Sequence, residues 1–152
     1  MRVTTRGRYG LRVVMELAAC RGRGPMTASA IARNQGISGK YVRVLAARLG
    51  AAGIVTAVRG PRGGYALTRE PSAITAREVV AALEGPLAPV ACVHDALSCP
   101  RSRRCAARDV WCDVARAVDG VLASLTMDEL AARHTVKQQR AAPGRDARGV
   151  ES

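Results

Sequence analysis

Phenylalanine is absent from the 152 residues of the chain, and only one Trp and three Tyr are present. Hydrophobic residues still make up 48% of the sequence, which is enough for a core. That core must therefore be built from Val, Leu, Ile and Ala. The shortage of aromatic side chains also disfavours single-stranded RNA as a partner, because proteins usually hold RNA by stacking its bases on aromatic rings.

Long apolar runs are also missing. The run from Leu11 to Cys20 is interrupted by Arg12 and Glu16, and nothing approaches the roughly 20 apolar residues that a membrane span needs. No secretory signal is visible, so we expect a cytoplasmic protein with no membrane partner. Five cysteines in such a chain are expected to be reduced, metal-binding or redox-active rather than paired in structural disulfides, and the odd count agrees.

Acidic residues are scarce in the first half of the chain. Residues 1–70 contain 13 Lys and Arg but only two acids, whereas residues 71–140 contain nine basic and eight acidic residues. The net charge of +12 is therefore concentrated in the first half. This distribution predicts a surface for a polyanion in residues 1–70 and a different role for the cysteine-rich second half.

Histidines are few, which bears on catalysis. Only His94 and His134 could act as imidazole bases, and no Ser/His/Asp arrangement is evident. The sequence therefore predicts that the protein is not an enzyme.

The basic first half has the pattern of a helix–turn–helix. Apolar spacing predicts a helix over residues 5–21, a short helix after Thr27 or Ser29, a turn at Gly36, and a second helix from Ser38 to about Leu49. The residues that suit this motif are small or aliphatic: Ala32, Gly36, Ile37, Val42 and Leu45. A helical hairpin with a solvated basic face would show the same spacing.

A predicted β-hairpin over residues 54–68 follows the helix–turn–helix and would form a wing. We predict major-groove contacts from the second helix and minor-groove contacts from the wing turn. The residues predicted to contact DNA are Ser38, Lys40, Tyr41, Arg43, Arg59, Arg62 and Gly63. The turn is not a phosphate-binding P-loop, because it lacks the Lys-Ser/Thr ending and the following helix.

The second half begins with a short helix over residues 75–84 and a cysteine-bearing loop. A helix from about 105 to 125 then carries an apolar stripe, which predicts the seam of a homodimer. We expect a mainly α fold with a small β-hairpin wing, a winged helix–turn–helix domain plus a long dimerisation helix. Its predicted parts are 1–84 (DNA-binding domain), 85–104 (cysteine loop), 105–133 (dimerisation helix and short terminal helix) and 134–152 (disordered tail).

Four cysteines lie close together in the second half. Six, five and six residues separate Cys92, Cys99, Cys105 and Cys112, and arginines crowd the same stretch. Cationic neighbours favour the thiolate, the form that binds soft metals and iron–sulfur clusters. A zinc site is less favoured because the short CxxC pairs of zinc ribbons are absent. A disulfide pair or ordinary buried cysteines would also be compatible with this spacing.

These residues resemble the Rrf2 family of bacterial transcriptional regulators, with its IscR-like, NsrR-like and CymR-like branches. The matching segments are MRVTTRGRYGLR (1–12), QGISGKYV (35–42), VRGPRGGYAL (58–67), the stretch 78–92, and the cysteines with Trp111 beyond them. The resemblance covers about residues 1–133. It implies a homodimeric winged-helix repressor or activator that binds double-stranded DNA operators, and we expect a repressor.

In the cluster-binding branches three loop cysteines hold iron, and they correspond here to Cys92, Cys99 and Cys105. The resemblance thus implies an iron–sulfur cluster, with a two-iron two-sulfur type favoured over a four-iron four-sulfur type, that senses iron–sulfur, redox or nitric oxide status. The fourth ligand stays open, because Arg108 stands where the IscR-like branch has histidine and Arg8 where the NsrR-like branch can have an acid. The remaining ligand candidates are Cys112, His94, Asp95 and Asp109.

One segment points to another branch. The stretch LEGPLAPV over residues 83–90 is more similar to the CymR-like branch, which has no cluster and works with an enzyme partner. The second prediction is therefore a cluster-free or zinc-containing winged-helix repressor of cysteine or sulfur metabolism, controlled by a metabolic enzyme. Arg43 also replaces an acid of the IscR-like recognition helix, so no operator sequence can be transferred.

Overall fold

A computed structural model describes residues 3–141 of the chain. The first part contains α1 (Thr5–Ala19), α2 (Ala28–Gln35), α3 (Gly39–Ala51), β1 (Val55–Val58), β2 (Gly64–Leu67), the 3-10 turn η1 (Pro71–Ala73) and α4 (Ala76–Glu84). The second part contains α5 (Ala91–His94), the 3-10 turns η2 (Ala96–Ser98) and η3 (Ser102–Arg104), α6 (Ala106–Ala123) and α7 (Met127–Ala141). The predicted fold, mainly α with a small antiparallel hairpin, is confirmed.

The helices of the first part begin after short polar residues, at the positions that the sequence predicts. The hydroxyls of Thr4, Thr27 and Ser38 each accept a hydrogen bond from a backbone N–H in the first turn of the helix that follows. Thr75 does the same for α4, and the Glu78 carboxylate accepts a bond from the Thr75 backbone N–H in return. Each cap satisfies N–H groups that have no partner inside the helix.

The core is aliphatic, as the composition requires. The buried side chains come from α1, α2, α3, both strands, α4, the start of α7 and the segments just before β1 and after η1. The largest of them are Ile31, Leu45, Leu49, Ile54, Ile74, Leu83 and Met127. Burying one such side chain contributes about 1.5–3 kcal/mol relative to leaving it exposed. The first part is therefore held together mainly by its hydrophobic core.

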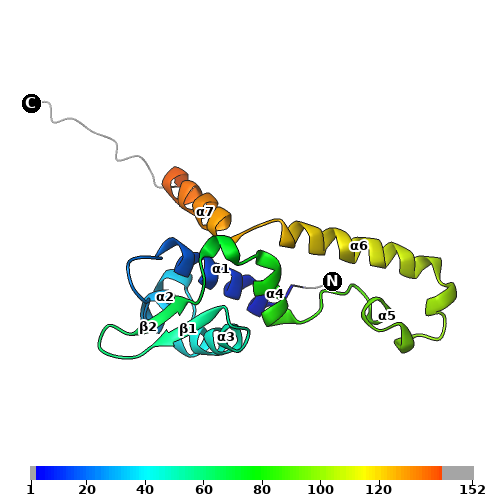
Figure 1. Ribbon diagram of the computed structural model, residues 1–152, viewed down its shortest axis with the longest axis horizontal. Helices are drawn as coiled ribbons and strands as arrows, with labels where there is room; N and C mark the ends of the chain where they lie inside the picture. Colours follow the sequence, from blue (N-terminus) through cyan, green and yellow to red (C-terminus); the bar gives the residue numbers. More distant parts are fainter. Residues whose placement is uncertain (1–2, 142–152) are drawn as a thin grey trace, which may run out of the picture.

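Helix α7 belongs to this core, although the predicted division placed it with the dimerisation helix. It packs on α1, and Figure 1 shows it beside the first part of the chain, away from α6. The backbone of Met127 donates to Ile74 O at 2.8 Å, and Ala76 donates to Leu125 O at 2.8 Å. These bonds join the start of α7 to the start of α4.

The predicted disordered tail is wrong for residues 134–141, which continue α7. The helix begins with a reciprocal cap, because Thr126 and Glu129 each accept a bond from the other's backbone N–H. Strong helix formers such as Lys137, Gln138 and Arg140 then extend it. The rest of that predicted tail, 142–152, lies outside the described residues.

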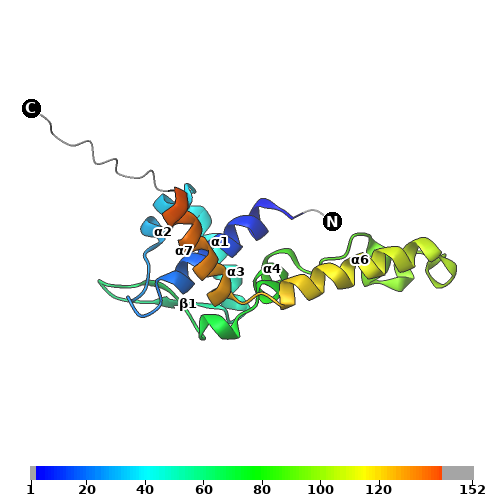
Figure 2. The same ribbon diagram turned by 90° about the horizontal axis from the view of Figure 1, so that it is seen from above.

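The cysteine loop and α6 extend away from the domain, as Figures 1 and 2 both show. Three short helical turns, α5, η2 and η3, interrupt the loop. No residue of α6 is buried. Among the described residues, no helix is both long enough and apolar enough to cross a membrane.

Candidate DNA-binding surface and cysteine loop

Helices α2 and α3 form the predicted helix–turn–helix. Gly36 ends α2 in the left-handed conformation with φ of 65°, which a residue without a Cβ adopts at little cost. The Ile37 N–H then bonds to Ala32 O at 3.0 Å and turns the chain toward α3. Val42 and Leu45 of α3 are fully buried beneath this turn. The buried side of α3 determines which of its residues face the solvent.

The solvent side of α3 is basic. Lys40 and Arg43 are exposed, and Tyr41 is half-buried. Ser38 lies at the start of the helix, where its hydroxyl accepts the Tyr41 N–H at 3.1 Å. All four predicted contact residues of this segment thus lie on one helix or its cap, which is the geometry of a recognition helix entering a major groove.

Sequence reasoning missed two arginines beside this helix. The Tyr9 ring of α1 meets the Tyr41 ring edge-on, with centroids 6.4 Å apart. The guanidinium groups of Arg8 and Arg12 lie 5.8 and 5.2 Å from the centre of the Tyr9 ring. The aromatic pair therefore links a basic segment of α1 to the recognition helix. The i, i+4 spacing predicts that the two arginines share a face of α1, but it does not indicate that this face lies beside α3.

The wing is a tight hairpin in which β1 pairs with β2 from Val55–Leu67 to Val58–Gly64. Arg59 and Arg62 are exposed at its turn. A Cβ on Gly63 would lie 2.3 Å from Val58 O, so only glycine fits there. Gly63 therefore shapes the turn whether or not its backbone contacts DNA. Helix α3 and β1 are in contact, and α3 and the hairpin occupy the same side of the domain in Figure 1.

Both acids of the first half are engaged in internal contacts. Glu16 accepts hydrogen bonds from the side chains of Asn34 and Gln35, which ties α1 to the end of α2. Glu70 pairs with Arg21 at 2.5 Å. Neither carboxylate lies on α3 or in the wing turn, so the basic character of that surface is not offset by an acid within it.

The structure places the three predicted cluster ligands on successive parts of one loop. Cys92 lies in α5, Cys99 directly follows η2, and Cys105 precedes α6 as its N-terminal cap residue. All are half-buried free thiols. The Arg108 side chain donates to Cys92 O at 2.8 Å and so holds the start of the loop against α6.

The loop contains donor atoms that could bind a metal group, but these atoms are not close together. Within residues 3–141, no three His, Cys, Asp or Glu side chains converge as a metal site would require. The donor chemistry nevertheless fits an iron–sulfur cluster, because three free thiols lie within one short segment. In addition, the Ser102 hydroxyl, between Cys99 and Cys105, is buried with no hydrogen-bond partner. A buried hydroxyl without a partner is costly, so this loop conformation leaves a polar group unsatisfied.

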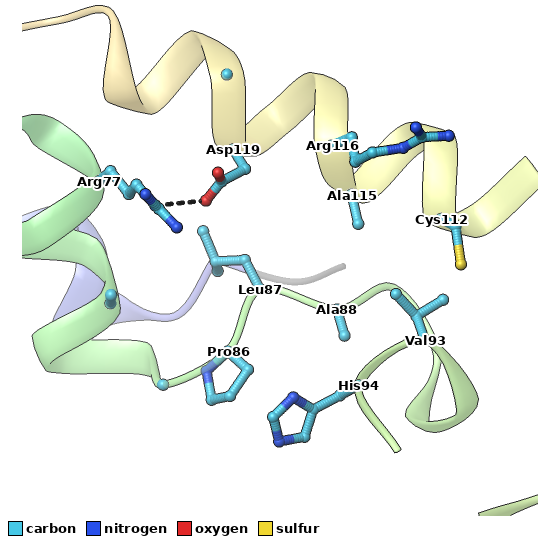
Figure 3. Close-up of a pocket in the computed structure, with 13 residues that line it drawn as sticks. Arg77, Pro86, Leu87, Ala88, Val93, His94, Cys112, Ala115, Arg116 and Asp119 are labelled. Atoms are coloured by element: carbon cyan, nitrogen blue, oxygen red, sulfur yellow. Dashed lines mark ion pairs between the residues drawn. The ribbon is translucent and has the colours of Figure 1, made fainter. Parts of the chain in front are cut away.

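Two further candidate ligands lie elsewhere. Cys112 and His94 line a cavity between α4, α5 and α6. Figure 3 shows the Cys112 sulfur pointing from α6 toward the α5 segment near Val93. Cys112 and His94 thus line the same cavity, and the choice of a fourth ligand stays a prediction.

Comparison with known proteins agrees with this architecture. The Rrf2 family model, described as an iron-dependent transcriptional regulator, matches residues 3–133. The chain belongs to the Rrf2 family. It is therefore a DNA-binding transcriptional regulator and not an enzyme.

Relatives from two branches match with similar coverage. The regulator CymR of Bacillus subtilis is 40% identical over 131 residues, which are 86% of this chain and 90% of that protein. The regulator IscR of Photobacterium profundum is 33% identical over 138 residues, 91% of this chain and 80% of that protein. Rrf2 regulators are typically dimeric.

Solved structures support the same family. The structure of CymR, the global cysteine regulator of B. subtilis, has a TM-score of 0.74 and 38% identity, and covers 88% of this chain and 98% of its own. An IscR structure from T. potens has a TM-score of 0.74 and 33% identity, and covers 91% of both chains. The Rrf2 fold is thus shared by both branches, so the fold does not distinguish between them.

Proposed function

We propose that this Rrf2 protein is a homodimeric, cytoplasmic repressor that binds an operator with α3 in the major groove and the wing in the adjoining minor groove. The observation that carries the proposal is the exposed basic face of α3, with Lys40 and Arg43, beside a wing that presents Arg59 and Arg62. Arginine suits guanine O6 and N7 in the major groove, and it also suits the negative potential of a narrow minor groove.

The exposed apolar stripe of α6 supports the homodimer. Val110, Val114 and Val121 are 58%, 37% and 60% exposed. Trp111, on the same helix, is 43% exposed. A row of exposed large apolar side chains on one helix is unfavourable in water and favours association with a second copy.

We further propose that Cys92, Cys99 and Cys105 hold an iron–sulfur cluster, of the two-iron two-sulfur type, through which the protein responds to iron–sulfur, redox or nitric oxide status. A bound cluster would supply a redox-active centre at the loop. The residues of this chain would contribute the thiolates, the surrounding positive charge of Arg101, Arg103 and Arg104, and the Arg108 bond that anchors α5 to α6. Ordering of the loop would need to bring the three thiols together.

A second candidate is a cluster-free regulator of cysteine metabolism controlled by an enzyme partner. One observation favours it: the 40% identity to CymR, a protein that the solved structure describes as the global cysteine regulator of B. subtilis. Zinc at the same thiolates belongs to this second candidate.

DNA binding is tested by selecting bound duplexes from a random library and measuring Kd for the selected sequence. We expect Arg43→Ala to weaken binding by about 1–3 kcal/mol and to relax the preference at one base pair. Arg133→Ala removes an exposed arginine of α7 and is the matched control. Equal affinity for random and selected DNA would contradict the proposal.

The cofactor is tested on protein purified without oxygen, by absorption spectroscopy with iron, sulfide and zinc assays. Stoichiometric iron and sulfide that disappear in Cys99→Ser, but not in Cys20→Ser after the first helix, would support the cluster. Iron-free protein that also resists reconstitution would favour the second candidate.

A further inference from the structure

A cavity of about 840 Å³, open to solvent, lies between α4 of the domain and the α6 helix. Its walls come from α4, the linker that follows Gly85, α5 and one face of α6 (Figure 3). Small-molecule sites typically have volumes of about 300–1,000 Å³. None of the residues assigned above to DNA contact lines this cavity. Its position therefore separates it from the operator-binding surface.

Small side chains create the space. The residues that contribute little or no side chain are Ala81, Gly85, Ala88, Ala115 and Gly120. A Cβ built on Gly120 would meet no other atom within 4 Å, although glycine in the middle of a helix usually costs about 1 kcal/mol relative to alanine. The remaining wall is largely apolar, with Leu87 and Val93 at the linker and α5.

The cavity is not on the helix face that we assign to the dimer. Each residue turns an α-helix by about 100°, so Ala115 lies about 140° around α6 from Val110, and Asp119 lies about 140° from Val114. Ala115 and Asp119 line the cavity, whereas the two valines do not. A second chain that packs on the valines would therefore leave the cavity to another ligand.

Charged groups at the rim favour an anion. Two arginines and one aspartate line the cavity, which leaves one positive charge in excess. Arg77 pairs with Asp119 at 2.7 Å and so neutralises it. Arg116 pairs with Asp113 one turn away, but its side chain is 79% exposed. An exposed pair of this kind contributes only about 0–1 kcal/mol, so Arg116 can turn to a ligand at little cost.

We propose that this cavity binds a small amphipathic anion, a molecule with an apolar body and one carboxylate or similar group. The apolar body would lie against Leu87, Val93 and Ala115, and the anionic group would face Arg116. The proposal goes beyond operator and cluster binding, and it applies to the loop conformation in which α5 forms one wall of the cavity.

The probe for the test is anilinonaphthalene sulfonate, an aromatic anion whose fluorescence rises in apolar sites. Its uncharged parent, anilinonaphthalene, serves as the matched probe without the negative group. We expect the sulfonate to bind once per chain, and we expect Gly120→Leu to weaken it by roughly tenfold or more, about 1.4 kcal/mol. Ala123→Leu adds the same side chain at an exposed position of α6 outside the cavity and should leave binding unchanged.

Arg116→Gln removes the positive charge and keeps a polar side chain at the rim of the cavity. It should weaken the sulfonate several-fold and leave the uncharged probe unaffected, whereas Arg133→Gln on α7 should change neither. Unchanged binding of the sulfonate to Gly120→Leu would overturn the site, since binding would then lie elsewhere, for example on the α6 valines. Equal loss of both probes in Arg116→Gln would overturn the assignment to an anion. These measurements contain no DNA, so they are independent of operator binding.

Discussion

The DNA-binding domain and the region over residues 85–123 use the same aliphatic residues in opposite ways. In the domain, side chains from Val13 to Leu83 form one buried cluster, which Met127 of α7 completes. Over residues 85–123, the only buried residue is Ser102, a polar one. Large apolar side chains are instead exposed there, with Leu97 at 88% and Val121 at 60%.

This difference shows which region can be stable in a single chain. The domain buries a continuous apolar core, whereas the cysteine loop and α6 leave large apolar side chains in water. The second region should therefore depend on association with a second copy, and its stability should depend on protein concentration.

The largest expected effect lies in the domain core. Leu45 is fully buried at the centre of α3. We expect Leu45→Ala to lower the free energy of unfolding by about 2–5 kcal/mol, because it removes buried methyl groups and leaves a cavity. Denaturant unfolding followed by circular dichroism measures this change.

Leu97→Ala is the matched control for the core substitution. The same truncation at a side chain that is 88% exposed should change the unfolding free energy by no more than about 0.5 kcal/mol. A loss as large as that of Leu45→Ala would mean that Leu97 is buried in the dimer, and the contrast between the two regions would then be reduced.

The next effect should appear in assembly rather than in folding. Val114→Glu places a charge on the exposed stripe of α6 and should weaken the dimer at least about tenfold, about 1.4 kcal/mol. Analytical ultracentrifugation over a concentration series measures it. Val136→Glu, at an exposed valine of α7, is the control. If the Val114→Glu dimer were as tight as the wild-type dimer, the dimer interface would have to lie elsewhere.

The same contrast explains what could be predicted from the sequence. Period and capping signals are local, so the helix–turn–helix, the wing and the start of α4 at Thr75 all follow from them. The return of α7 to the core was not predicted, because it depends on the contact of Met127 with a domain distant in sequence. The Tyr9–Tyr41 contact that brings Arg8 and Arg12 to α3 is likewise tertiary.

The sequence predicted the position of the cysteine loop in the chain but not its conformation. Spacing and resemblance pointed to Cys92, Cys99 and Cys105, and all three lie in one loop. Within residues 3–141, however, no three potential ligand side chains lie close enough together to hold a metal ion. A loop with few buried contacts takes its final geometry from its ligand or partner. The sequence pattern of the loop alone therefore does not predict that geometry.

A smaller effect is expected where α4 meets the start of α1, inside the domain. Glu84 ends α4, and its Oε1 accepts hydrogen bonds from the Thr4 N–H at 3.0 Å, the Thr4 hydroxyl at 2.6 Å and the Gly7 N–H at 2.8 Å. It thus caps α1 from another helix. Burial tends to raise the pKa of Glu84, but the bonds from Thr4 and Gly7 and the charge of Arg6 outweigh it, and the pKa is lowered.

Because the folded-state pKa is lowered, the ionised Glu84 stabilises the fold. Its contribution is fully present above the ordinary value near 4.5 and is lost as the pH falls through the lower folded-state value. We expect Glu84→Gln to cost about 1–2 kcal/mol at neutral pH and to flatten the fall in stability in acid. Denaturant unfolding over a pH series measures both effects.

Glu70→Gln is the control for charge, because Glu70 is 67% exposed and pairs only with Arg21 at the surface. Its effect should stay below about 1 kcal/mol.

If Glu84→Gln kept the wild-type dependence on pH, the acid sensitivity would have to come from other carboxylates. Glu78 is the next candidate, because the backbone hydrogen bond from Thr75 and its contact with Arg69, opposed by burial, also lower its pKa. Helix α4 would then be held against α1 by the apolar contact of Leu83 with Gly10, where an added Cβ would lie 2.0 Å from the leucine, and not by the carboxylate.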